Sequence, residues 1–108
     1  MKEKLYKADI NISTIGNNTI ITAPGDGHYL AIDFVALLST TAVAVQFVSG
    51  STNYGGSFPL DAKQSMTFEN ATGNQDGVIT CGNNEAFIIN LGDNVQVGGF
   101  IRYRIIGN

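Results

Sequence analysis

Histidine and cysteine are almost absent from this chain of 108 residues, and tryptophan is missing altogether. The one cysteine, Cys81, cannot form an intrachain disulfide, so no disulfide framework supports the fold. No basic residue stands beside it in the sequence to activate it, so we expect a buried, unreactive thiol. Because His28 is the one histidine, the chain offers no His or Cys pair for zinc. We therefore expect no metal site and no cofactor.

The groups that carry catalysis are equally scarce. A Ser-His-Asp or Cys-His arrangement would have to use His28, and no serine stands in the pattern of a nucleophile elbow. The glycine-rich segment 49–57 has no lysine after its glycines, which argues against a phosphate-binding loop. Four aspartates lie in or beside predicted loops: Asp26, Asp61, Asp76 and Asp93. They match no EF-hand spacing, so turn formation is the better interpretation than calcium binding. The sequence predicts no catalytic residues and a protein that is not an enzyme.

Charge is low and unevenly distributed. Charged residues make up 14% of the chain, against about 25% in typical soluble domains. Three of the six basic residues are Lys2, Lys4 and Lys7, and from residue 8 onward eight acidic residues face three basic ones. An acidic body repels phosphate backbones, so we expect no binding to nucleic acid.

Long apolar runs are missing as well. No segment approaches the ~18 apolar residues that a membrane-spanning helix needs, and the opening MKEKLYKAD lacks the apolar stretch of a signal peptide. We therefore expect a protein that folds in a reducing cytoplasm and does not contact membranes.

The residues that are abundant favour strands joined by polar turns. Turn signals such as Pro24-Gly25-Asp26-Gly27 and Gly92-Asp93-Asn94 separate short apolar runs about a dozen residues apart. This spacing predicts an all-β chain, an antiparallel β-sandwich or jelly roll of about eight strands. Residues 11–108 fit one domain, and residues 1–10 form a basic arm that leads into it.

Two long strands show which side chains face the core. In the strand predicted over residues 29–38, Leu30, Ile32, Phe34, Ala36 and Leu38 share the inward face at period two. In the last strand the inward set is Val95, Val97, Ile101, Tyr103 and Ile105. Gly98-Gly99 inside that strand indicates a bulge or a close backbone approach. Unbroken alternation is favoured, because a bulge there would bury Arg102 and Arg104.

Several apolar residues are left on faces that point away from this core. They are Val35, Leu37, Val48, Ile88, Phe100 and Ile106. Outer faces of a sandwich are normally polar, and large exposed apolar patches usually mark interfaces. The pattern favours a homo-oligomer over the alternative, in which the N-terminal segment or long loops cover these residues. Lys2, Lys4 and Lys7 are expected either to contact an acidic surface of a neighbouring subunit or to form a disordered terminus.

Three segments together resemble known proteins. They are Val45-Gln46-Phe47-Val48-Ser49-Gly50-Ser51, then Leu60-Asp61-Ala62, and Ile89-Asn90-Leu91 followed by Val97-Gly98-Gly99-Phe100-Ile101-Arg102-Tyr103. The pattern, within residues 27–104, is similar to that of small tailed-phage virion proteins.

This resemblance implies a capsid decoration (cement) protein with a β-sandwich fold. Such a protein is often a homotrimer, is assembled in the host bacterial cytoplasm, and docks in the virion on the major capsid protein or another virion protein. The alternative it leaves open is a receptor- or carbohydrate-binding module of a fibre or tail. Tyr54, the one aromatic in the predicted loop 49–57, is the candidate contact for that role.

Overall fold

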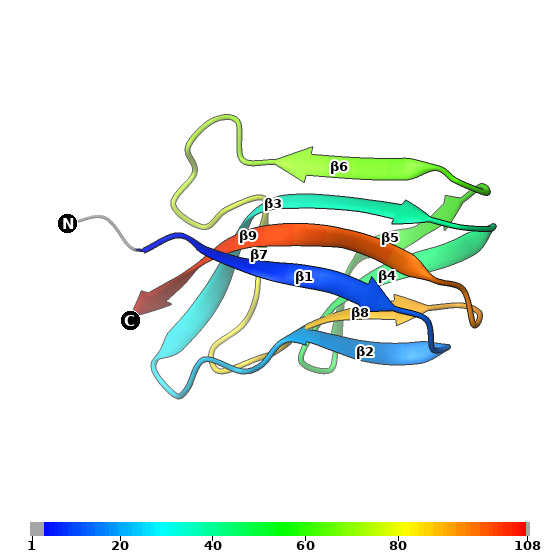
Figure 1. The fold of residues 1–108 in the computed structure, drawn as a ribbon. Coiled ribbons are helices and arrows are strands. Elements are labelled where there is room, and N and C mark those ends of the chain that lie inside the picture. The colour runs from blue at the N-terminus through cyan, green and yellow to red at the C-terminus, as the bar shows by residue number, and fades with distance from the viewer. Residues whose placement is uncertain (1–3, 108) are drawn as a thin grey trace.

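The chain folds into two antiparallel sheets. The computed structural model describes residues 4–107, and within that range it contains strands and no helix (Figure 1). In chain order the strands are β1 (Tyr6–Ile12), β2 (Gly16–Ile21), β3 (His28–Ser39), β4 (Val43–Ser49), β5 (Thr52–Leu60), β6 (Ser65–Glu69), β7 (Ile79–Thr80), β8 (Phe87–Leu91) and β9 (Val97–Gly107). The prediction of an all-β chain is confirmed. About eight strands were expected, and β7, of two residues, makes a ninth.

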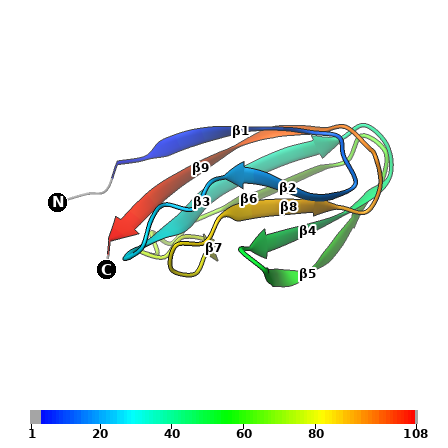
Figure 2. The same cartoon turned by 90° about the horizontal axis from the view of Figure 1, so that it is seen from below.

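The two sheets have a regular order. The first runs β1-β9-β3-β6, with β7 also paired to β3, and the second runs β2-β8-β4-β5. The first strand thus pairs with the last, β2 with β8, β3 with β6 and β4 with β5, all antiparallel. Figure 2 shows the two layers from the side, with β1, β9 and β3 in one and β8, β4 and β5 in the other. No helix in the described range is long and apolar enough to cross a membrane.

The core lies between the layers. Phe47, Phe87 and Ile89 contribute from the second sheet, and Ile32 and Ile101 from the first, all at 2% exposure or less. Phe47 on β4 also meets Phe68 on β6 of the other sheet, with ring centroids 6.0 Å apart. Burying side chains of this size is worth roughly 1.5–3 kcal/mol each, so this cluster is what holds the sheets together.

A β-bulge at Asp33 reverses the faces of β3. Ile32 pairs with Tyr103 and Phe34 with Arg102, so Asp33 is an extra residue in β3. After it the alternation shifts, and Val35 and Leu37 enter the core at 0% and 3% exposure. The assignment of these two residues to an outward interface is therefore wrong.

Three more residues expected at an interface are covered by the chain itself. Val48 and Ile88 are paired across β4 and β8 on the side away from the core, yet they are only 4% and 9% exposed. Ile106 is 4% exposed. The premise that these side chains face solvent is wrong. For Ile88 the reason is its central strand, because Thr19 and Val48 on the neighbouring strands flank it.

Strand β9 follows the predicted unbroken alternation. Val97 and Ile101 are buried, Tyr103 and Ile105 pack against the core, and no register shift occurs at Gly98-Gly99. The close backbone approach lies at Gly99, where a Cβ would collide with the carbonyl oxygen of Ala36 and lie 2.8 Å from the Cα of Leu37. This glycine is therefore required by the packing of β9 on β3.

The prediction of a loop over residues 49–57 is wrong, because most of this segment belongs to edge strand β5. Every residue from Thr52 to Ser57 is exposed, so this part of the edge strand has no buried face to produce a period-two signal, which begins only at Phe58 and Leu60. A register shift leaves Gly55, Gly56 and Ser57 without partners in the ladder with β4. The side chain of Gln46 compensates by donating hydrogen bonds to the carbonyls of Gly55 (2.9 Å) and Tyr54 (3.4 Å).

The basic arm is shorter than the sequence indicates. Strand β1 begins at Tyr6, and Tyr6 pairs with Tyr103 on β9, where the two rings stack 5.4 Å apart. Residues 6–10 therefore belong to the sheet, and Ile10 is buried.

Replacing Gly99 with alanine should destabilise the fold, because the new Cβ has no room against β3. We expect the free energy of unfolding to fall by about 2 kcal/mol, as in other overpacked sites. Gly98→Ala is the matched control, since a Cβ there would meet nothing closer than the Ile10 carbonyl oxygen at 3.8 Å. It should raise the free energy of unfolding by about 0.5–1 kcal/mol, because glycine inside a strand is less favourable than alanine by that amount. Urea titration of both variants measures the difference, and equal effects would contradict it.

Candidate functional site

The candidate site is the side of the sheet β1-β9-β3-β6 that points away from the core, called here the outer face. In antiparallel strands, directly paired residues point to the same side. The strand register therefore places twelve residues of the outer face in three rows across β1, β9, β3 and β6. They are Lys7, Arg102, Phe34 and Glu69; Asp9, Phe100, Ala36 and Thr67; and Asn11, Gly98, Leu38 and Ser65.

The middle of the outer face is apolar. Phe34 and Phe100 lie against one another with ring centroids 5.3 Å apart, and Ala36 lies beside them. Leu38 is 47% exposed and Phe100 37% exposed, although the full burial of such a side chain is worth roughly 1.5–3 kcal/mol. Exposed apolar side chains gathered in one place are typical of a contact surface.

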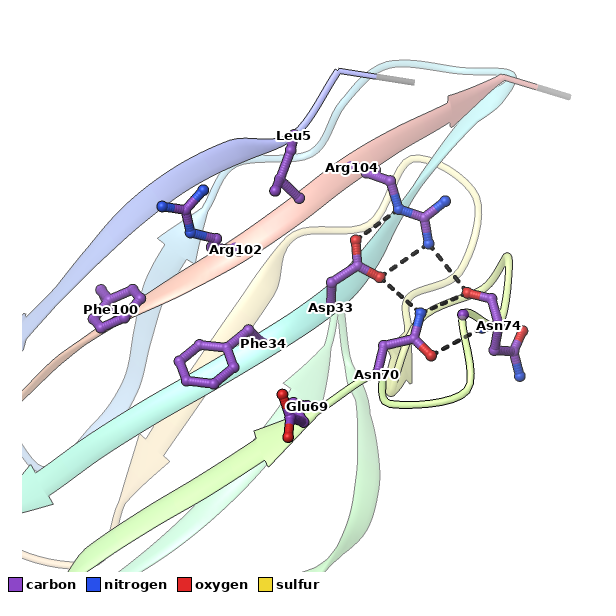
Figure 3. A pocket seen from close by; sticks show the side chains of 10 residues that line it. Leu5, Asp33, Phe34, Glu69, Asn70, Asn74, Phe100, Arg102 and Arg104 are labelled. Carbon is purple, nitrogen blue, oxygen red and sulfur yellow. Dashed lines mark hydrogen bonds and ion pairs between the residues drawn. The ribbon is translucent and has the colours of Figure 1, made fainter. Parts of the chain in front are cut away.

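A groove of about 550 Å³ opens at one end of the outer face (Figure 3). The aromatic pair Phe34 and Phe100 forms one part of its lining, and Leu5 and Arg102 lie along the side of β9. Its other end is polar and includes the bulge residue Asp33.

The polar end of the groove is held by one ion pair. Arg104 donates from Nε to Oδ2 of Asp33 (2.7 Å) and from Nη2 to Oδ1 (3.0 Å). Their side chains are only 15% and 18% exposed. Asn70 also donates to Oδ1 of Asp33, at 3.1 Å, and Nη2 of Arg104 donates to the carbonyl of Gln75, at 2.7 Å. These bonds, most of which Figure 3 shows, anchor the loop after β6 to the sheet.

Charge on the outer face is divided between its two edges. Lys7 on β1 lies directly opposite Arg102 on β9, and like charges in such a pair are destabilising. An ion pair with Asp9, 3.0 Å from Nζ of Lys7, offsets part of this, but both groups are more than half exposed. Glu69 lies at the opposite edge, on β6, and no other described residue forms an ion pair with it or with Arg102.

Of the interface residues predicted from sequence, few lie on this surface. Lys2 falls outside the described residues. Lys4 is exposed, with Nζ 5.2 Å from the centre of the Tyr6 ring, and Lys7 lies on the outer face. Phe100 is the one of the six predicted apolar residues that is exposed there.

The residues that the prediction missed are Phe34, Ala36 and Leu38. The sequence assigns them to the core, and the bulge turns them outward. Asp33 was the available signal, as the one charged residue inside the apolar run.

Tyr54, the predicted loop contact, lies on edge strand β5 and is 38% exposed. It borders a small cavity of about 210 Å³ whose lining includes Phe47, Phe58 and Phe68. The cavity is apolar and lies beside the core. Tyr54 is therefore not part of a cluster of exposed aromatic and polar side chains of the kind that binds sugars.

Cys81 is buried, as expected, at 3% exposure. Burial raises the pKa of its thiol to about 11, and the nearby Glu85 carboxylate acts in the same direction, against a lowering contribution from Ser49. Ser49 donates to Oε1 of Glu85 (2.8 Å) and accepts a hydrogen bond from the Gly82 amide (2.9 Å). A thiol that stays protonated is a poor nucleophile. Residues 4–107 contain no group of three His, Cys, Asp or Glu side chains that could hold a metal ion.

Comparison with known proteins gives no match to a family model, to a curated protein or to a solved structure.

Removing the charge of Arg104 should destabilise the protein strongly. Arg104→Met leaves Asp33 largely buried without its partner and releases the loop after β6, and breaking such a pair costs about 3 kcal/mol. Lys7→Met is the control, because it breaks an exposed pair and should cost less than about 0.5 kcal/mol. Chemical unfolding of both variants measures the two losses. Similar small losses would show that the Asp33–Arg104 pair does not anchor the loop.

The raised pKa of Cys81 should make stability fall in alkaline solution. In the unfolded chain the thiol loses its proton near its ordinary pKa of 9.0, whereas the folded chain keeps it until about pH 11. Above pH 9 the unfolded state therefore binds fewer protons, and its favoured ionisation lowers the free energy of unfolding. Relative to Cys81→Ala, the wild type should lose about 1.4 kcal/mol per pH unit between pH 9 and 11. Parallel curves for the two proteins over this interval would refute the assignment.

Proposed function

We propose that this chain is a structural protein of a phage particle that forms a homo-oligomer on the capsid and stabilises it as a decoration protein. The observation that carries the proposal is the outer face, where Phe34, Ala36, Leu38 and Phe100 lie together and partly exposed. Of the six apolar residues that the alternation pattern predicts to point outward, only Phe100 is exposed. The bulge in β3 turns Phe34, Ala36 and Leu38 outward instead, on one continuous surface with Phe100.

The strand order supports a more specific fold, a β-sandwich of the jelly-roll type. Leaving out the two-residue β7, the eight remaining strands pair first with last, second with seventh, third with sixth and fourth with fifth. This is the order of a long antiparallel hairpin rolled into two four-stranded sheets. Jelly rolls are common in viral capsid proteins, but lectin domains and cupin enzymes use them too, so the fold alone does not decide the function.

The proposal includes no catalytic activity and no cofactor. Two candidate catalytic groups support this part of the proposal. The thiol of Cys81 is held in its protonated form, and Nδ1 of His28 contacts the backbone carbonyl of Asp26. The proposed partners are other copies of the chain, for which the resemblance implies a trimer, and the major capsid protein or another virion protein. Lys4 and Lys7, exposed near the start of the chain, suit an acidic surface on such a partner. The proposed setting is the virion, with no contact to nucleic acid or membrane.

A second candidate is a receptor- or carbohydrate-binding module of a fibre or tail. The groove favours it to a degree, because an aromatic pair lies beside carboxylate, amide and guanidinium groups. Against it, the polar groups of Asp33, Asn70 and Arg104 already bond to one another and to the loop after β6. Such groups recognise sugars only when they are available to hydroxyls, so assembly is the better-supported function.

Sedimentation equilibrium of the wild-type chain tests the assembly. At roughly 20 µM, a concentration suited to micromolar or tighter association, the measured mass should be at least twice the 11.5 kDa of one chain. Binding to empty phage capsids from the same genome tests the docking, and a location beside capsid genes would agree with it. A monomer that does not bind capsids, or that binds glycans specifically, would overturn the proposal.

A further inference from the structure

Gly98 is a glycine that the chain itself does not require. A Cβ at this position would meet only the Ile10 carbonyl oxygen, at 3.8 Å, which is an ordinary contact. Glycine inside a strand costs about 0.5–1 kcal/mol relative to alanine, and such a residue often marks the close approach of another surface. Leu38, its direct partner on β3, points to the same side and is 47% exposed. The outer face therefore carries a protrusion and a depression side by side.

We propose that two copies of the chain pair through their outer faces, related by a two-fold axis that lies between the sheets and runs nearly parallel to the strands. This inference rests on the proposed function, because it names the partner and the geometry of the assembly. In a two-fold contact the same patch meets itself, so the patch must be self-complementary in both shape and charge.

The three rows of the outer face meet this requirement. Rotation about an axis parallel to the strands keeps each row but reverses its order, so β1 faces the partner's β6 and β9 faces the partner's β3. Leu38 then lies over Gly98 of the other copy, and Phe100 lies over its Ala36. Because the axis is two-fold, each of these large-on-small contacts occurs twice in the interface, once from each copy.

Charge supports the same axis. The reversed first row places Lys7 opposite Glu69 of the other copy, and Arg102 over the ring of its Phe34. The first contact is an ion pair and the second a cation–π contact, and both offset the unfavourable pairing of Lys7 with Arg102. An axis perpendicular to the strands would instead stack each strand on itself. Arg102 would then meet Gly98 and Lys7 would meet Asn11, without any charge complement.

The size of the outer face is sufficient for a stable pair. Strands β1, β9, β3 and β6 have 7, 11, 12 and 5 residues, and at about 3.3 Å per residue and 4.8 Å between strands they cover roughly 550 Å². Two such faces bury about 1,100 Å² in total, just above the roughly 1,000 Å² expected of a specific interface. Stacked sheets keep their strands within about 30° of each other, which a nearly strand-parallel axis satisfies.

A charge swap tests the pairing. Lys7→Glu alone places two acidic groups together at both ends of the interface, and we expect the dissociation constant of the pair to rise about tenfold. Glu69→Lys should have a similar effect. The double variant Lys7→Glu/Glu69→Lys restores opposite charges and should recover wild-type affinity within about threefold. Lys7 and Glu69 lie on opposite edges of the same sheet, so rescue inside one chain is excluded.

Shape variants test the same contact independently. Leu38→Asp should raise the dissociation constant at least about 100-fold, and Gly98→Phe, whose Cβ has room inside the chain, should block the partner's Leu38. Ile15→Asp is the matched control, because Ile15 is a 55% exposed apolar residue in the turn between β1 and β2. It should leave the assembly unchanged. Sedimentation provides the masses, and circular dichroism checks that each variant is folded.

The outcomes separate this inference from the proposed function. An even number of chains, weakened by the shape variants and rescued by the charge swap, supports the pairing. An assembly that all the variants leave intact, or one of three chains, overturns the pairing while the proposed homo-oligomer stands. A monomeric wild type overturns the pairing, and a monomer that also fails to bind capsids overturns the proposed function as well. If a monomer binds capsids and loses that binding in Leu38→Asp, the outer face contacts the capsid and the pairing alone is overturned.

Discussion

The fold and the candidate site both depend on one extra residue in β3. The bulge at Asp33 shifts the alternation of every residue that follows it, so Val35 and Leu37 fill the core while Phe34 points outward. The bulge residue is itself held in place, because its carboxylate accepts two hydrogen bonds from Arg104. That ion pair also anchors the loop after β6. The composition of the core, the apolar outer face and the position of a loop therefore follow from one local irregularity.

The sequence predicts the faces of β9 but not those of β3, and the difference is physical. In β9 the wrong alternation would bury Arg102 and Arg104, and the cost of burying unpaired charge selects the right one. In β3 both faces are largely apolar, so the hydrophobic effect gives no penalty that distinguishes them. The residue that settles the question is Asp33, and its partner Arg104 lies 71 positions away in the chain. A pattern within one strand cannot contain that contact.

Counting outward apolar residues from alternation overestimates what solvent can reach. Ile88 lies on a central strand with Thr19 and Val48 directly beside it, and neighbouring side chains cover much of its surface. For edge strands the alternation pattern fails in the opposite way, because it gives too little signal for a strand to be recognised. Strand β5 has almost no buried residue, so a segment that is largely paired with β4 has the composition of a loop. The sequence therefore predicts the class of fold, whereas exposure depends on where each strand lies within its sheet.

The two adjacent glycines of β9 show how the demands of folding differ from those of a contact. Gly99 is needed within the chain, because the backbone of β3 leaves no room for a Cβ. Gly98 has that room and still has no side chain, at a cost to the strand and beside a Leu38 that remains half exposed. Folding of a single copy would favour a larger residue at position 98 and a polar one at position 38. The residues present at both positions become favourable once a second surface lies on the sheet, because a protruding leucine needs a depression to enter.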